Sequence, residues 1–146
     1  MKEIKILKKS KNAILPKKAT TGSAGWDLYA CIDEKIKIHP GQLIKVPTGI
    51  AIALPSSDLV ALVFARSGLA VKNGVTLSNG VGVIDSDYRG EIQVGLCNIG
   101  DKDFEINPND RIAQMLVMPI FNANLTLCEK LDETNRGEGG FGSTGK

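Results

Sequence analysis

The segment from Gly82 to Glu91 holds the residue types best suited to chemistry in this 146-residue chain. It carries three acids, one base and one of only two tyrosines within ten residues. Apolar residues lead into it and alternate after it, which predicts a β-hairpin with a polar tip. A carboxylate such as Asp85, held at the end of a strand beside the ring of Tyr88, could position a water against a substrate. The alternative is a solvated turn, although turning alone does not require a tyrosine.

A second candidate site follows the apolar strand that ends near Ala65. Arg66 and Ser67 would present a guanidinium, a hydroxyl and free helix-start amides to a phosphate. The alternative is an arginine that snorkels at a strand end, with Ser67 as a helix cap. Gln114 lies in another apolar strand, where a buried amide needs partners, so it is either structural or faces a ligand.

The last eleven residues, 136–146, differ in kind from the rest of the chain, because five of them are glycine. Such a run cannot bury enough apolar surface to order itself alone. It nevertheless carries Arg136, which could bind a phosphate, and Phe141, which could stack on a base. Its glycines would let backbone amides approach an anion closely. We interpret residues 136–146 as a flexible lid over a nucleotide, with a floppy tail as the alternative.

Composition indicates one globular domain, since 42% of the residues are hydrophobic and 23% are charged. The net charge of +2 is too small to indicate a nucleic-acid partner. No apolar run is long enough to indicate a membrane partner or a signal peptide. Cys31, Cys97 and Cys128 are widely spaced, and we expect buried, reduced thiols. Reduced thiols favour a cytoplasmic location.

The elements that must position these residues are mostly strands. Apolar runs between turn signals predict strands at residues 36–38, 43–46, 49–54, 59–64, 91–98, 111–118 and 125–128. One short helix is expected over residues 67–73, with Gly74 as its stop. The pattern predicts an all-β sandwich or barrel at residues 1–135, followed by the glycine-rich arm.

Five segments together resemble the motifs of the trimeric deoxyuridine triphosphatase (dUTPase) family, in the family's order. These segments are residues 24–28, 66–70, 82–90, 111–114 and 136–145. One departure is Ala65, where the family commonly has proline. The resemblance implies a homotrimer of distorted jelly-roll subunits that hydrolyses dUTP to dUMP and pyrophosphate by attack of water on the α-phosphate. That reaction limits uracil in DNA and supplies dUMP for dTMP synthesis.

The resemblance also implies roles for single residues. Asp85 would orient and deprotonate the water, with Gln114 as the second catalytic residue, and Tyr88 would pack on the deoxyribose. The substrate-binding residues would be Arg66, Ser67, Gly68, Asn79, Gly82, Val83, Ile84, Tyr88, Arg136, Phe141, Gly142, Ser143 and Thr144. Among these, Asn79 and the 82–84 backbone would select uracil, and Phe141 would stack on it. Mg²⁺ would be held by the phosphates and waters, without a direct protein ligand and with Asp27 in its outer shell.

The family's sites lie between subunits, so the resemblance implies that three chains contribute to each site. Residues 82–91 would come from one subunit, Arg66, Ser67 and Gln114 from a second, and the arm from a third. Two other functions stay open. One is a deoxycytidine triphosphate deaminase of the same fold, although that family has a second serine where this chain has Gly68. The other is a non-catalytic β-sandwich that binds nucleotides or a partner protein.

Overall fold

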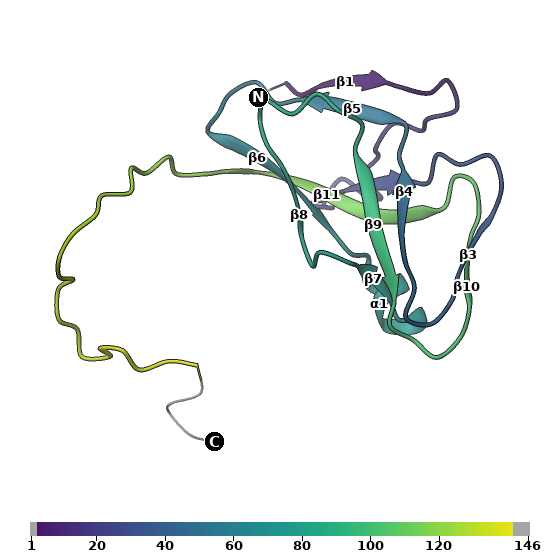
Figure 1. The fold of residues 1–146 in the computed structure, drawn as a ribbon. Helices are drawn as coiled ribbons and strands as arrows, with labels where there is room; N and C mark the ends of the chain where they lie inside the picture. Colours follow the sequence, from purple (N-terminus) through teal and green to yellow (C-terminus); the bar gives the residue numbers. More distant parts are fainter. Residues whose placement is uncertain (1–2, 142–146) are drawn as a thin grey trace.

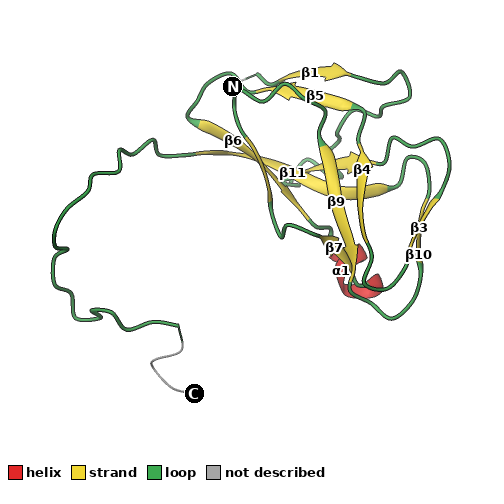
Figure 2. Cartoon of the chain, in the orientation of Figure 1, coloured by secondary structure: helices red, strands yellow, loops and turns green. Residues whose placement is uncertain are grey.

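The structure, a computed structural model, describes residues 3–141. Within them lie eleven strands and one short helix (Figures 1 and 2). The strands are β1 (Lys5–Lys8), β2 (Trp26–Tyr29), β3 (Ile36–Ile38), β4 (Leu43–Pro47), β5 (Ile50–Ala53), β6 (Leu59–Phe64), β7 (Val75–Leu77), β8 (Gly82–Ile84), β9 (Gln93–Asn98), β10 (Phe104–Ile106) and β11 (Arg111–Pro119). The helix α1 spans Ser67–Asn73. The predicted all-β class with one short helix is confirmed.

Two antiparallel sheets carry the candidate sites. One has the order β2-β11-β6-β8 and the other the order β4-β9-β7, while β1-β5 and β10-β3 form separate pairs. Alternation along β9 turns Val94, Leu96 and Asn98 inward and leaves Gln93 exposed. The inward faces bury an aliphatic core whose largest fully buried members include Leu28, Ile38, Ile50, Ile92, Leu96, Ile106 and Ile112. This arrangement is consistent with a jelly-roll type of fold.

The helix begins and ends where the sequence predicts. Gly74 follows it with φ +67°, a left-handed conformation that favours glycine. A Cβ atom at Gly74 would press on the backbone of Gly100, so this close approach also requires glycine. The Gly74 amide bonds back to the carbonyl of Ala70, which closes the last turn.

The predicted hairpin over residues 82–91 is wrong. β8 pairs with β6, at Gly82↔Val63 and Ile84↔Ala61, whereas β9 pairs with β4 and β7. Residues 85–92 therefore cross from one sheet to the other, rather than closing a hairpin. A local pattern of two strands around a turn cannot distinguish these cases, because both put alternating apolar residues beside polar ones.

The predicted strand at residues 125–128 is also wrong in the single chain. After β11 the chain runs away from the body of the fold, as Figure 1 shows, and residues 120–128 are exposed and unpaired with any strand. Cys128 is accordingly exposed, whereas Cys31 and Cys97 are half-buried, so the expectation of three buried thiols fails. All three cysteines are free. Within residues 3–141 no helix is long and apolar enough to cross a membrane.

Candidate active site

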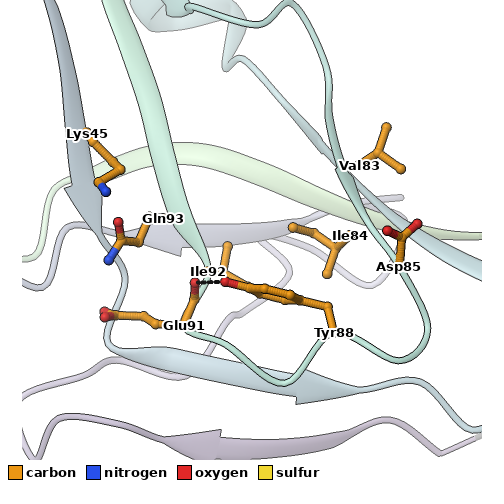
Figure 3. A pocket seen from close by; sticks show the side chains of 8 residues that line it. All are labelled: Lys45, Val83, Ile84, Asp85, Tyr88, Glu91, Ile92 and Gln93. Carbon is orange, nitrogen blue, oxygen red and sulfur yellow. Dashed lines mark hydrogen bonds between the residues drawn. The ribbon is translucent and has the colours of Figure 1, made fainter.

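A pocket of about 400 Å³ lies where the 85–92 crossover leaves β8. Its walls are formed by Lys45, Val83, Ile84, Asp85, Tyr88, Glu91, Ile92 and Gln93. Figure 3 shows the Tyr88 ring in the middle of the group, with Asp85 on one side and Lys45 and Gln93 on the other. The structure thus brings the predicted Asp85, Tyr88, Val83 and Ile84 together in one pocket.

Backbone contacts hold the crossover in a fixed shape. The Tyr88 amide donates to the Asp85 carbonyl at 3.2 Å, and the Tyr88 hydroxyl donates to the Glu91 carbonyl at 3.0 Å. The ring therefore lies back over its own loop. Gly90 makes this possible, because a Cβ atom there would overlap the Tyr88 hydroxyl and ring. The fixed turn and tethered ring meet the requirement for a preorganised site.

The far end of the crossover is anchored to the turn between β4 and β5. Glu91 accepts a hydrogen bond from the Gly49 amide through Oε1 at 2.7 Å. The buried Thr48 hydroxyl donates to the Ile92 carbonyl at 2.6 Å, and the Ile92 side chain lies in the core. These two attachments, one buried and one part-buried, hold one side of the crossover, and the β8–β6 pairing holds the other.

Asp85 itself keeps its carboxylate free. Its side chain is exposed, and no described residue contacts its carboxylate oxygens through a hydrogen bond or an ion pair. All of its lone pairs are available to a water or a ligand. A free carboxylate at a rigid strand end, beside an aromatic ring, can accept a proton from a water placed between it and a substrate.

A second pocket, of about 300 Å³, lies beside the end of β6 and the start of α1. Its lining residues are Ala19, Ser23, Ala24, Gly25, Asp27, Arg66, Ser67, Gly68 and Gln114. The predicted phosphate-binding residues Arg66, Ser67, Gly68 and Gln114 are therefore gathered in one place, and Asp27 lies with them.

Asp27 is the charged centre of this second pocket. Its Oδ1 lies 3.0 Å from Arg66 Nε, and its Oδ2 lies 3.2 Å from Arg111 Nη1. The Arg66 guanidinium also donates through Nη1 to the Arg111 carbonyl at 3.2 Å. Only 13% of the Asp27 side chain and 25% of the Arg66 side chain are exposed, so water screens their attraction weakly. The carboxylate fixes one guanidinium toward the pocket.

Gln114 has a structural partner as well as a place in the pocket wall. Its Nε2 donates to the Ala65 carbonyl at 3.0 Å, which ties β11 to the exit of β6. Its Oε1 faces Gly25, where an added Cβ atom would come within 3.0 Å. Both readings of this residue, structural and ligand-facing, are thus compatible with its position.

The two pockets lie at opposite ends of the β6–β8 pair. The paired residues run from Val63↔Gly82 to Ala61↔Ile84. Arg66 lies three residues beyond the Val63↔Gly82 end, and Asp85 lies one residue beyond the Ala61↔Ile84 end. At about 3.4 Å per residue, six steps separate their backbones by about 20 Å. That backbone separation is longer than a triphosphate group, which favours separate roles for Asp85 and Arg66 within one chain.

Other predicted residues lie in neither pocket. Asn79 is exposed in the turn before β8. Arg136 donates through Nε to the Gly139 carbonyl at 2.7 Å, within a local turn of the arm, and Phe141 is exposed. Gly142, Ser143 and Thr144 lie outside the described residues.

The residues that the structure adds to those assigned from sequence include Arg111, Lys45 and Gln93. Arg111 and Arg66 both pair with Asp27. In the sequence, Arg111 could have been noticed as a charged residue at the start of an apolar strand. Lys45 and Gln93 line the Asp85 pocket from β4 and β9, and no local signal marked them. Within residues 3–141, no group of three or more His, Cys, Asp or Glu side chains is placed to hold a metal ion.

Comparison with known proteins gives one consistent result. The family model described as dUTPase matches residues 11–145. A protein of Desulfitobacterium hafniense named deoxyuridine 5'-triphosphate nucleotidohydrolase is 54% identical over 143 residues, which cover 98% of this chain and 95% of that protein. A protein of the same name from Paraburkholderia phymatum is 46% identical over 144 residues, covering 99% and 97%.

Solved structures show the same fold at lower identity. A dUTPase of Staphylococcus bacteriophage 80alpha with dUpNHpp has a TM-score of 0.88 and is 24% identical, with 99% of each chain covered. A dUTPase from phage phi11 of S. aureus has a TM-score of 0.80, with 21% identity over 90% of this chain and 99% of that one. A mutant of this phi11 dUTPase coordinates a structural Mg(II) ion.

Proposed function

The chain belongs to the dUTPase family and hydrolyses dUTP to dUMP and pyrophosphate, and we propose that the chemistry takes place at the Asp85–Tyr88 pocket. The observation that carries this assignment is the free carboxylate of Asp85 beside a tethered aromatic ring. Asp85 accepts a hydrogen bond from a water and takes its proton as the water oxygen attacks the α-phosphorus. The bond from that phosphorus to the bridging oxygen breaks, and pyrophosphate leaves. In-line positioning supplies much of the rate.

Tyr88 orients the rest of the nucleotide. Its ring packs on the deoxyribose, where a ribose 2′-hydroxyl would meet the ring, so UTP is rejected on steric grounds. The backbone of Gly82, Val83 and Ile84, together with Asn79, selects uracil by its donor and acceptor groups. Among the strands of residues 3–141, β8 is an edge strand that pairs with β6 alone, which leaves its outer backbone groups available.

The second pocket binds the phosphates. Arg66 is fixed by Asp27, and the exposed Ser67 and Gly68 at the start of α1 lie beside it. Gln114, locked to the Ala65 carbonyl, is the catalytic partner that completes this wall. Charged and polar side chains that are already in position stabilise a transferring phosphoryl group, because the site does not have to rearrange during the reaction.

The second pocket is compatible with a Mg²⁺ ion whose ligands are the triphosphate oxygens and water molecules. The fit rests on Asp27, whose two oxygens each accept one guanidinium. A carboxylate has about four lone-pair sites, so Asp27 can still accept hydrogen bonds from metal-bound waters. When bound, Mg²⁺ would neutralise the developing charge on the phosphates.

The separation of the two pockets supports a homotrimer with shared sites. The 85–92 crossover of one subunit meets the Arg66 pocket of a second, and the arm of a third covers the nucleotide. The exposed arm agrees with this assembly, since Phe121, Leu125 and Leu127 are 102%, 100% and 99% exposed. Monomeric soluble proteins rarely expose several large apolar side chains in one segment. Leu125 and Leu127 alternate along the chain, as expected for a strand that pairs with the edge of a neighbouring subunit's sheet.

Mixing two inactive variants tests the shared site. Asp85→Asn and Arg66→Ala are each expected to be inactive, but co-expressed chains should regain activity, because about a quarter of randomly mixed sites combine an intact crossover with an intact Arg66. The matched control mixes Asp85→Asn with Tyr88→Ala, which alter the same crossover and should restore nothing. Light scattering reports the mass of each mixture. Activity in a dilute monomer would contradict the assembly.

The arm acts as the lid of this site. Arg136 reaches the outer phosphates, Phe141 stacks on uracil, and Gly142, Ser143 and Thr144 supply amides and hydroxyls to the γ-phosphate. Removal of residues 136–146 should leave dUMP binding partly intact and lower kcat by orders of magnitude, because lid contacts form only on closure. Steady-state kinetics and calorimetry separate the two effects, and unchanged kinetics would contradict the lid.

A panel of dUTP, dCTP, dTTP and UTP with pyrophosphate detection tests the activity itself. Release from dUTP alone is expected. The deaminase alternative predicts ammonia from dCTP, and the non-catalytic alternative predicts no product from any nucleotide. The relatives' names favour neither alternative.

A further inference from the structure

Lys45 gives the Asp85 pocket a cation at the end opposite the carboxylate. It lies on β4, one strand away from the crossover in the second sheet. Its register partner on β9 is Gly95, and the space that a Gly95 side chain would fill is taken by the Ser78 hydroxyl. Among the residues that line this pocket, Lys45 is the only one with a positive charge.

The ammonium of Lys45 makes no hydrogen bond or ion pair with a described protein group. The ion pairs within residues 3–141 do not include it, and no described hydrogen bond uses Lys45 Nζ. Glu91 lines the same side of the pocket. Its Oε1 accepts the Gly49 amide, and no described hydrogen bond or ion pair joins Glu91 to Lys45. Lys45 Nζ therefore has three donors available for a ligand.

The order of groups across the pocket matches the order of groups in a nucleotide. Figure 3 shows Asp85 on one side of the group, Tyr88 in the middle, and Lys45 on the other side together with Gln93 and Glu91. On the proposed function, the α-phosphate lies at Asp85 and the sugar at Tyr88. The base then extends toward Lys45. In a pyrimidine, C4 is the ring atom opposite N1, the atom bonded to the sugar, so the group on C4 reaches farthest in that direction.

We propose that Lys45 is a specificity-determining residue, which donates a hydrogen bond from Nζ to the C4 carbonyl oxygen of uracil. An ammonium can only donate, so it matches a carbonyl at C4 and opposes the amino group that cytosine carries there. This contact deepens the proposed function and rests on it. It adds a side-chain reader of the base to the backbone groups of β8.

The test compares Lys45→Met, which keeps the stem and removes the charge, with Lys45→Arg, which keeps a cationic donor. Lys45→Met should lower kcat/KM for dUTP about tenfold, chiefly through KM, because the contact is equal in ground and transition states. Its kcat/KM for dCTP should stay the same or rise. Lys45→Arg should recover part of the loss. Lys72→Met on the exposed face of α1 is the matched control and should change neither substrate.

Direct measurement of nucleotide binding tests the role of Lys45 independently of the hydrolysis of dUTP. Calorimetry with dUMP and dCMP should show that Lys45→Met weakens dUMP about tenfold and leaves dCMP unchanged, whether or not the protein turns over dUTP. An equal loss for both nucleotides would place the lysine on the shared C2 oxygen or in a structural role, and would overturn the proposal. An unchanged dUMP-to-dCMP ratio would overturn it as well. Equal melting temperatures of variant and parent would exclude a folding defect as the cause.

Discussion

The two pockets use an aspartate in opposite ways. Asp27 is nearly covered, and each of its oxygens is bound to a guanidinium. Asp85 is exposed, and its carboxylate has no partner within residues 3–141. A carboxylate with both oxygens engaged is suited to fixing its neighbours, whereas one with free lone pairs is suited to handling a proton. The difference separates positioning from catalysis within a single chain.

Loss of the free carboxylate should have the largest effect on activity. Asp85→Asn removes the proton acceptor and should lower kcat by about 10²- to 10⁴-fold, with dUTP binding largely kept. Its melting temperature should not change, because no described residue depends on this carboxylate. Pyrophosphate release, calorimetry and thermal unfolding measure the three quantities. Full activity in this variant would count decisively against the assignment.

A change behind the ring should have the next largest effect. Gly90→Ala places a methyl group against the Tyr88 hydroxyl and breaks its bond to the Glu91 carbonyl. Displacement of the ring should lower kcat/KM for dUTP about 10²-fold. Gly22→Ala is the matched control, because nothing lies within 4 Å of a Cβ atom there. Equal kinetics in the two variants would mean that the tether of Tyr88 has no role.

Loss of the engaged carboxylate should act mainly on binding and stability. Asp27→Asn leaves Arg66 without its charged anchor, so KM for dUTP should rise about tenfold while kcat changes less. The free energy of unfolding should fall by about 1–3 kcal/mol, because two guanidiniums lose a mostly covered partner. Denaturant unfolding and steady-state kinetics check both. A pattern like that of Asp85→Asn, with kcat lost and stability kept, would erase the contrast between the two aspartates.

A third aspartate, Asp103, provides a reference for the other two, and loss of its partner should have the smallest effect of the changes described. Asp103 is exposed like Asp85 but paired like Asp27, with His39 Nδ1 at 2.8 Å from its Oδ1. The hydrogen bond from His39, with a further contribution from Lys37, lowers the pKa of Asp103 from its ordinary value. In His39→Ala the pKa of Asp103 should rise toward that value, as measured by NMR titration of its carboxyl carbon.

The sign of the accompanying stability change follows from linkage. A pKa lowered by folding stabilises the protein above the unfolded pKa, and this stabilisation is lost as the pH falls through the folded pKa. His39→Ala should therefore be slightly less stable than the parent near neutral pH and equal to it in strong acid. A stability difference that grows in acid would contradict the pairing.

Local chemistry made parts of this fold predictable. The helix over residues 67–73 and its stop at Gly74 follow from short-range signals, since the cap is closed by residues within one turn. Strand β6 and strand β11 follow from long apolar runs. The hairpin over residues 82–91 and the strand at 125–128 failed because pairing partners are chosen elsewhere in the chain. For residues 125–128, the described part of the single chain, residues 3–141, offers no pairing partner.

The sequence by itself determined the residue types of the site, the all-β class and the family, because these depend on motifs and on apolar periodicity. Only the tertiary structure decided which aspartate is engaged, since Asp27 and Arg111 are 84 residues apart. It also decided that the crossover and the phosphate pocket occupy opposite ends of one strand pair, and that Lys45 faces Asp85 across a pocket. Side chains acquire such partners through sheet register, which long-range packing fixes and local sequence does not encode.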